Sequence, residues 1–489
     1  MDTGTEADQK IAGGNRLIGV ENAEGPCRKK PGRSKKEPPT EINLADGLPI
    51  VMEHFLPGLP ELFRKLPEPR DSQRLYFPKE LLLMQALLMA LTQASSRRQF
   101  GRDCANGNYS QNLAALLSMD IPELASADTV NYLLTMMNPE QMEEILPELG
   151  RHLIRSRALD CFRLEECFLL AFDGTEVLRQ TNIPHCPNCL TAKHSDGRTD
   201  YFHQVVDAKL VTDPGLTLSL GFEFIENDGR DYVKQDCELK AFYRLAETIK
   251  KRFPRLSICV LGDALYACEK VIDILMEYNW SFFISFLPER IPTLYAEAEA
   301  KLAANPKNRL IIRNAETKET CTYSWAGNLK YRGKLLHAVY VDIAGDDGKT
   351  MRLAYLTDFR PDRNNVLELV NKGGRQRAKI ENCFNIQKNH GYNLEHVYGA
   401  IGHALKNFYT IIQIAHLIHQ LMLYSDLFRK LAGKSCKSCF SSAIKVYETI
   451  RHFTASPAEA LRHKTFSDIA SLRKFASRIQ LRFVFGNSS

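Results

Sequence analysis

Three carboxylates stand in this sequence at positions where they could share metal-dependent chemistry. Asp173 follows the apolar run Phe168–Phe172, and Asp263 follows the run Leu256–Leu261. Glu381 lies in a later segment with a helical pattern. Carboxylates held together repel one another unless a cation neutralises them, and their hard oxygen atoms select Mg²⁺ or Mn²⁺. Two such ions can clamp the attacking and leaving oxygens of a phosphoryl displacement. The alternative is that the acids only favour turns at strand ends.

Two cations accompany the glutamate along its predicted helix. Arg377 precedes Glu381 by four residues, and Lys388 follows it by seven. At 3.6 residues per turn all three share one face, which suits a phosphate backbone lying across the helix. A solvated face with salt bridges is the alternative. The apolar Ile380 and Phe384 indicate that the same helix also packs on a core.

The elements that must position these side chains have an α/β pattern. Strands are predicted at Phe168–Phe172, Tyr201–Val211, Leu216–Phe224, Leu256–Leu261 and Phe282–Phe286. Helices are predicted on either side of the fourth strand. This order favours a mixed five-stranded sheet flanked by helices. In such a sheet the first and fourth strands can be neighbours, so their ends would bring Asp173 and Asp263 together.

Changes of composition divide the 489 residues into six regions. Residues 1–40 lack periodicity and predict a disordered basic tail. Residues 41–160 predict a helical region whose cations are candidates for DNA contact, 161–290 the first part of an α/β core that contains the first two acids, and 291–350 a separate β-rich insertion. Residues 351–425 complete the core with the Glu381 helix, and 426–489 form a basic helical C-terminal region.

The quoted segments resemble DDE transposases of the insertion-sequence-four type. The likeness is carried by Phe172–Glu176, Leu261–Tyr266 and Arg377–Lys388, and it extends over roughly residues 165–425. The signature around the family's glutamate is Tyr, two residues, Arg, three residues, Glu, six residues, Lys. This chain matches at its arginine, glutamate and lysine, whereas Gly374 stands at the tyrosine position.

The resemblance implies a ribonuclease-H-like catalytic core in which Asp173, Asp263 and Glu381 hold two Mg²⁺ or Mn²⁺ ions. It implies nicking at transposon ends and strand transfer into target DNA, with recognition of the terminal inverted repeats by a synaptic homodimer or higher oligomer. Arg377, Lys388 and Tyr266 are implied as DNA-contacting residues. The family is chiefly bacterial, which implies a cytoplasmic, nucleoid-associated protein.

A Cys/His cluster offers a second kind of metal site. Cys186 and Cys189 form a CxxC pair that is preceded by His185 and followed by His194 and His203. Two thiolates and two imidazoles could hold a structural Zn²⁺ tetrahedrally. The alternative is a loop with two free thiols.

Several basic segments are candidates for DNA contact. Arg97 and Arg98 follow an apolar helix and could contact phosphates, or they could complement that helix's dipole. The C-terminal cations would make backbone contacts or a dimer surface; they are Arg473, Lys474, Arg478 and Arg482. The run Arg28–Lys36 could be a loose phosphate-binding tail. The second CxxC, at Cys436 and Cys439, has only His452 and His463 as distant partners, so unlinked thiols are predicted.

Composition limits the class of protein. Apolar residues make up 44% and charged residues 25%, which excludes a largely disordered or fibrous chain. The apolar runs are too short to span a bilayer, and the polar start predicts no signal peptide. Two alternatives to a transposase remain open: a ribonuclease-H-like nuclease without transposition activity, and a zinc-stapled DNA-binding protein.

Overall fold

The computed structural model describes residues 44–104, 108–184, 186–229, 234–314, 318–346, 348–395, 399, 401–427, 461–462, 464–478, 481 and 483. The predictions for the tail 1–40, for His185 and for Arg482 lie outside these residues. So do those for the second CxxC and its two histidines.

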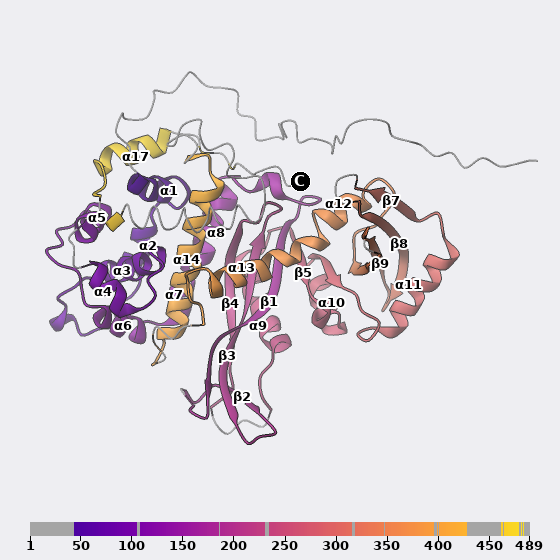
Figure 1. The fold of residues 1–489 in the computed structure, drawn as a ribbon, viewed down its shortest axis with the longest axis horizontal. Helices are drawn as coiled ribbons and strands as arrows, with labels where there is room; N and C mark the ends of the chain where they lie inside the picture. Colours follow the sequence, from indigo (N-terminus) through magenta and orange to yellow (C-terminus); the bar gives the residue numbers. More distant parts are fainter. Residues whose placement is uncertain are drawn as a thin grey trace, which may run out of the picture.

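A ten-stranded mixed sheet forms the centre of the described molecule (Figure 1). Its order is β2-β3-β1-β5-β6-β10-β9-β8-β7, and β4 also pairs with β3. The strands are β1 (Phe168–Thr181), β2 (Leu190–Lys193), β3 (Thr199–Val211), β4 (Thr217–Ile225), β5 (Ile258–Gly262), β6 (Ser281–Ser285), β7 (Arg309–Arg313), β8 (Thr320–Tyr331), β9 (Lys334–Ala344) and β10 (Thr350–Thr357). β1 runs parallel to β5, and β5 parallel to β6, whereas the other pairings are antiparallel.

The sheet corrects the prediction of five strands. β10 pairs with β6 on one edge and with β9 on the other, so that Tyr355 stands opposite both Ser285 and Val339. The strands predicted as a separate insertion therefore continue the central sheet instead of standing apart from it. Their presence was predicted, but the edge on which β10 pairs is a tertiary property that strand patterns do not specify.

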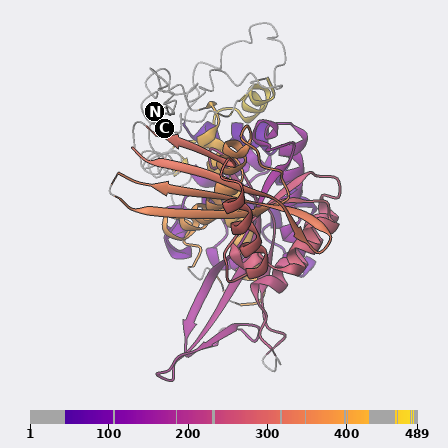
Figure 2. The ribbon, with the colours of Figure 1, turned by 90° about the vertical axis from the view of Figure 1, so that its right-hand side faces the viewer.

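The first strand is longer than predicted. β1 does not end at Asp173 but continues to Thr181, because β3 pairs with it from Leu170↔Leu210 to Thr181↔Asp200. Pairing with β5 stops at Ala171↔Leu261. Asp173 therefore lies just beyond the last residue of β1 that pairs with β5, at a point where β1 still pairs with β3. The far ends of β1 and β3, together with β2, project beyond the rest of the described molecule (Figure 1, Figure 2).

The helices of the N-terminal part gather at one end of the molecule with α14 (Ala404–Tyr424) and α17 (Ile469–Arg478), on the left in Figure 1. They are α1 (Gly47–Phe55), α2 (Leu59–Lys65), α3 (Lys79–Leu91), α4 (Arg97–Cys104), α5 (Asn108–Leu117), α6 (Ala127–Met136), α7 (Pro139–Glu143) and α8 (Ile145–Arg155). α14 is buried along nearly its whole length because it packs on both α3 and β4.

The remaining helices accompany the sheet: α9 (Glu238–Arg252), α10 (Glu269–Glu277), α11 (Pro292–Ala304), α12 (Val366–Asn371) and α13 (Ala378–Asn389). α9 packs on β3 and β4, and α13 packs on β1, β3 and β4. Among the described residues, no helix combines the length and the apolar character needed to cross a membrane.

Candidate functional site

Asp173 and Asp263 occupy equivalent positions on neighbouring parallel strands. Ala171 of β1 pairs with Leu261 of β5, and each acid lies two residues farther along its chain. Backbone N–H groups hold both carboxylates. Asp263 Oδ1 accepts from Leu265 at 2.7 Å and caps the 3-10 turn η4 (Ala264–Tyr266), while Asp173 Oδ1 accepts from Gly174 at 3.1 Å. The predicted adjacency of the first and fourth strands is therefore confirmed.

Glu381 approaches the same region from α13. This helix buries Ile380 and Phe384 and packs on β1, while the Glu381 side chain is 52% exposed. Arg377, directly before the helix, donates to Glu381 Oε1 at 2.6 Å. The predicted shared face of these two residues is present, and in this structure it takes the form of an ion pair.

The charge environment of Asp173 shows that the acids act on one another. Burial and the nearby carboxylates of Glu238, Glu381 and Asp263 together raise the pKa of Asp173 to about 7, against the opposing charge of Arg377. Asp263 and Glu381 thus both lie within electrostatic reach of Asp173. A cation placed among them would relieve this repulsion.

Glu238 is a fourth acid that the sequence reasoning missed. It begins α9, and its Oε1 accepts from the Tyr266 hydroxyl at 2.8 Å. A Cβ added at Gly174 would come within 2.6 Å of Glu238 Oε2. Burial raises the pKa of Glu238, which the hydrogen bonds from Tyr266 and from the Gly174 N–H oppose. Glu238 therefore contacts both Gly174, which follows Asp173, and Tyr266, which lies in the 3-10 turn that follows Asp263.

Two residues implied as DNA contacts have other partners here. Tyr266 is 1% exposed and bonded to Glu238, so it supports the site from within and does not face a ligand. This corrects its implied role, and the reason is that η4 folds its ring back against Phe242. Lys388 lies on α13 as predicted, with its Nζ 2.7 Å from Glu395 Oε1.

Gly374, at the signature's tyrosine position, lies against the ring of another aromatic residue. A Cβ at Gly374 would lie 2.9 Å from the ring of Tyr355 on β10. Burial raises the pKa of Tyr355, and the charges of Arg375 and Arg377 oppose this. An aromatic hydroxyl thus lies within electrostatic reach of the arginine that bonds to Glu381.

A buried polar network lies beneath the acids. Asp207, the register partner of Asp173 on β3, is fully buried and accepts hydrogen bonds from Ser219 at 2.7 Å and Tyr409 at 2.6 Å. Lys209 Nζ is 2.8 Å from Asp207 Oδ2 and donates to Gln413 Oε1 at 2.5 Å.

The same network reaches the glutamate helix. Gln387 of α13 donates to Gln413 Oε1 at 2.8 Å, and the Lys209 ammonium lies 5.4 Å from the centre of the Phe384 ring. The helix that carries Glu381 is therefore fastened to the strand that pairs with β1.

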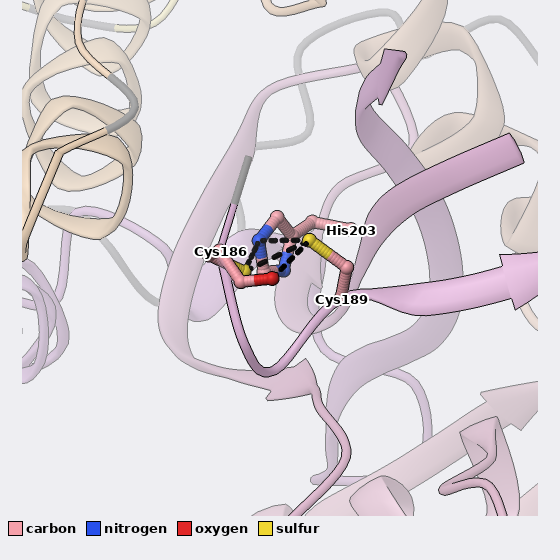
Figure 3. Close-up of side chains that lie close together, drawn as sticks. All are labelled: Cys186, Cys189 and His203. Carbon is pink, nitrogen blue, oxygen red and sulfur yellow. Dashed lines mark hydrogen bonds between the residues drawn. The ribbon is translucent and has the colours of Figure 1, made fainter. Parts of the chain in front are cut away.

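The Cys/His cluster forms at the far end of β1 and β3 (Figure 3). Cys186 Sγ lies 2.9 Å from Cys189 Sγ and 3.1 Å from His203 Nε2, and Cys189 Sγ lies 3.9 Å from the same nitrogen. Burial and the neighbouring Cys189 thiol raise the pKa of Cys186 to about 12. His194 is not part of this cluster, because its Nε2 lies 3.0 Å from Asp200 Oδ2.

The two candidate metal centres differ in how closely their ligand atoms approach. Within the described ranges, only Cys186, Cys189 and His203 place one ligand atom each within 4.8 Å of one another. The acids around Asp173 form a looser set in which Glu381 bonds to Arg377. The Cys/His cluster could thus hold a single ion, whereas the ligand atoms of the acids around Asp173 do not all approach one another within that distance.

The N-terminal cations occupy a different place from the one predicted. Arg97 and Arg98 begin α4 instead of ending the apolar helix α3. At the start of α4 these cations face the positive end of that helix's dipole, which they do not complement. Arg97 lies 3.2 Å from Asp128 Oδ1.

Neither a comparison with protein-family models nor one with curated proteins finds a match to this chain.

Proposed function

We propose that this chain is a DNA transposase that nicks transposon ends and joins them to target DNA by metal-dependent phosphoryl transfer. The observation that supports the proposal is the placement of Asp263 and Glu381 around Asp173. Two of these acids come from equivalent positions on adjacent parallel strands, and the third comes from a helix packed on the first strand. Their charges act on one carboxyl group.

The strand order supports the same proposal. The part of the sheet with order β4-β3-β1-β5-β6 has three antiparallel strands followed by two parallel ones, with α9 and α10 before the parallel strands. This order favours a ribonuclease-H-like core within the larger sheet. Strands β7 to β9 then occupy the chain over 291–350, between the second and third acids, where the β-rich insertion is predicted.

The donor set fits a pair of hard divalent cations. Asp173, Asp263 and Glu381 offer only carboxylate oxygens, which suit Mg²⁺ or Mn²⁺ and not softer ions. Such ions supply charge neutralisation at the phosphate and a lowered pKa for the attacking hydroxyl or water. Glu381 is half exposed at the surface of α13 and would have to leave Arg377 to share an ion with the two aspartates.

The surrounding cations are assigned to the nucleic acid. Arg377 is then available to contact a phosphate once Glu381 no longer holds it, and Lys388 lies further along α13. Arg377 and Lys388 would fix the register of a DNA backbone without reading its sequence. Arg97 and Arg98 would add phosphate contacts at the N-terminal end of α4, where the backbone N–H groups also favour an anion.

The test compares Asp173→Asn with Asp196→Asn, an exposed aspartate outside the site. Purified protein is incubated with Mg²⁺ and a labelled DNA that carries the inverted repeats flanking the gene. We expect the first variant to lose nicking and strand transfer by about a hundredfold or more, since a metal clamp contributes several kcal/mol. DNA affinity should stay equal or rise, because a charge that repels phosphate is gone.

Three other results would contradict the proposal that this chain is a transposase. Cleavage by Asp173→Asn at the wild-type rate would overturn the assignment of the acids. Nicking without any joined product would indicate a nuclease without transposition activity. Tight DNA binding with no metal-dependent cleavage by the wild type would indicate a DNA-binding protein.

A further inference from the structure

We propose that Cys186, Cys189 and His203 bind one zinc ion, which fastens the connection between β1 and β2 to strand β3. His203 pairs with Leu178 of β1, whereas Asp173 pairs with Asp207, so the site lies farther along β1 than Asp173. Figure 3 shows its three side chains turned toward one another. Its ion has a structural role and is distinct from the divalent ions assigned to the acids.

The spacing of the three ligand atoms fits a tetrahedral ion after small adjustments. With Zn–S bonds of about 2.3 Å and Zn–N bonds of about 2.0–2.1 Å, two ligating sulfurs lie about 3.8 Å apart and a sulfur and a nitrogen about 3.5 Å apart. The observed separations run from 2.9 to 3.9 Å. The two sulfurs lie closer together than in a zinc site and would have to move apart on binding, whereas the two sulfur–nitrogen separations lie on either side of the expected value.

The chemistry of the ligands selects the metal. Two thiolates with one imidazole are soft and borderline donors, which favour Zn²⁺ over Mg²⁺ or Ca²⁺. Cys189 and His203 are each 4% exposed, so the ion would be sheltered from water on that side. Cys186 is only partly buried and leaves a route of entry.

A built outer shell supports the ligands. Asn227, 3% exposed, donates from Nδ2 to the Cys189 carbonyl at 2.8 Å and from its backbone N–H to the Asn188 carbonyl at 3.0 Å. These bonds fix the CxxC turn. His203 Nδ1 lies 3.7 Å from Glu226 Oε1, which is longer than a hydrogen bond, so a small movement would bring the carboxylate to the position from which such groups orient metal-bound imidazoles.

Glu226 also connects the cluster to the helical part of the molecule. Its second oxygen is 2.6 Å from Lys406 Nζ on α14. The Lys406 ammonium in turn lies 5.3 Å from the centre of the Phe224 ring, which packs edge-on against His203. The outer shell is thus made by β4, the residues that follow it, and α14.

The position of the cluster explains what the ion would do. The β1–β3 register shifts between Glu176 and Leu178, and Leu178 pairs with His203. Such a bulge interrupts the ladder and bends the strand. A metal ion would join His203 to the loop before β2. It would fix the position of this loop relative to β3 at the bulge that interrupts the pairing of β1 with β3, in the part of the sheet that projects from the molecule.

The test is the metal content of the full chain, purified without chelator and assayed without DNA. We expect about one zinc per chain, as in other Cys/His sites. After exchange to Co²⁺, thiolate-to-cobalt charge-transfer and tetrahedral d–d absorption bands should appear. Cys186→Ser and His203→Asn should lose the zinc and the bands. Glu226→Gln should retain the site with roughly 10–100-fold weaker affinity.

Matched controls use the same residue types elsewhere. Cys161→Ser and His194→Asn should keep the zinc of the wild type, since neither residue belongs to the cluster. If a cluster variant does not fold, the wild-type chain is measured alone. Removing its metal with a chelator should lower the melting temperature, and adding Zn²⁺ but not Mg²⁺ should restore it.

Two outcomes would overturn the proposal. One is a chain that neither contains zinc nor takes it up after reduction. The other is a Cys186–Cys189 disulfide, seen as a mass lower by two hydrogens and the loss of two titratable thiols. The result is separate from the proposed transposase activity, because Asp173→Asn should keep its zinc whether or not the wild type cuts DNA.

Discussion

At the scale of single residues, Glu238 is the main addition to the site. An acid at the first position of a helix usually serves only as a partner for the helix dipole, and the sequence offers that interpretation for Glu238 as readily as any other. Its significance comes from Gly174, which leaves room for its carboxylate, and from Tyr266, which donates to it. These neighbours come from segments far apart in the sequence, so no local pattern could have identified them.

Tyr266→Phe tests this contact by itself. The change removes the donor to a half-buried carboxylate and keeps the ring in place, so the free energy of unfolding should fall by about 1–3 kcal/mol. Tyr76→Phe is the matched control, since Tyr76 is 72% exposed and should change stability by less than about 0.5 kcal/mol. Urea unfolding followed by circular dichroism measures both.

A double variant makes the test specific. If the hydroxyl acts through Glu238, Tyr266→Phe should cost less in a Glu238→Gln background than in the wild type. Equal costs in the two backgrounds would show that the hydroxyl contributes through some other group.

At the scale of elements, local sequence patterns predicted which segments form strands and helices better than they predicted how the strands pair. The alternation of Leu216–Phe224 correctly predicted β4, and the helix predicted before the fourth strand is α9. The region predicted as helical over 41–160 contains α1 to α8, of which α7 and α8 meet at Glu144.

The errors in the strands have a common physical cause. Asp173-Gly174 has the composition of a turn, yet β1 continues through it because β3 supplies hydrogen-bonding partners as far as Asp200. Likewise, the strand pattern of β10 was correct, but its pairing with β6 made the sheet ten-stranded. Pairing between distant strands depends on tertiary contacts, which a single sequence does not display.

The buried ion pair of Lys209 and Asp207 belongs to a hydrogen-bond network that reaches α13, the helix that carries Glu381. Both side chains are buried at 1% exposure or less, and Lys209 reaches α13 through Gln413 and Gln387. Lys209→Met leaves a buried carboxylate without its counter-charge, which should lower the free energy of unfolding by about 3–5 kcal/mol.

The matched control for this prediction is Lys251→Met. Lys251 pairs with Glu247 on the exposed face of α9, where an ion pair contributes about 0.5 kcal/mol or less. A loss at Lys209 no larger than the loss at Lys251 would show that the buried pair does not fasten α13.

At the scale of the whole molecule, α14 connects the N-terminal helices to the sheet and carries two buried histidines. Burial lowers the pKa of His416 well below its usual range and that of His419 to about 4, against an opposing hydrogen bond between His419 and the Leu91 backbone. Tyr392 Oη lies 2.5 Å from His419 Nδ1. Both rings are therefore neutral in the folded chain at neutral pH.

The burial of His419 predicts that the free energy of unfolding decreases as the pH falls. Unfolded histidine binds a proton near pH 6.5, whereas folded His419 resists it until about pH 4. Its contribution to stability is thus complete above pH 6.5 and is lost as the pH falls from 6.5 through 4, by about 3 kcal/mol in total.

Urea unfolding between pH 7.5 and 4.5 measures this dependence. His419→Gln should have a shallower slope across that range than the wild type, because one of the groups that binds a proton only after unfolding is gone. His194→Gln, outside α14, should keep the wild-type slope. Identical slopes in all three proteins would contradict a role for His419.

The outermost strand of the sheet has a consequence for how copies of this chain meet in concentrated solution. β7 is only five residues long, and Arg309, Ile311 and Arg313 form its exposed positions. If β7 of another copy paired with this strand in register, the guanidinium groups of Arg309 and Arg313 in the two copies would face one another. Such like-charge contacts oppose edge-to-edge growth, so this edge resists aggregation despite the length of the sheet.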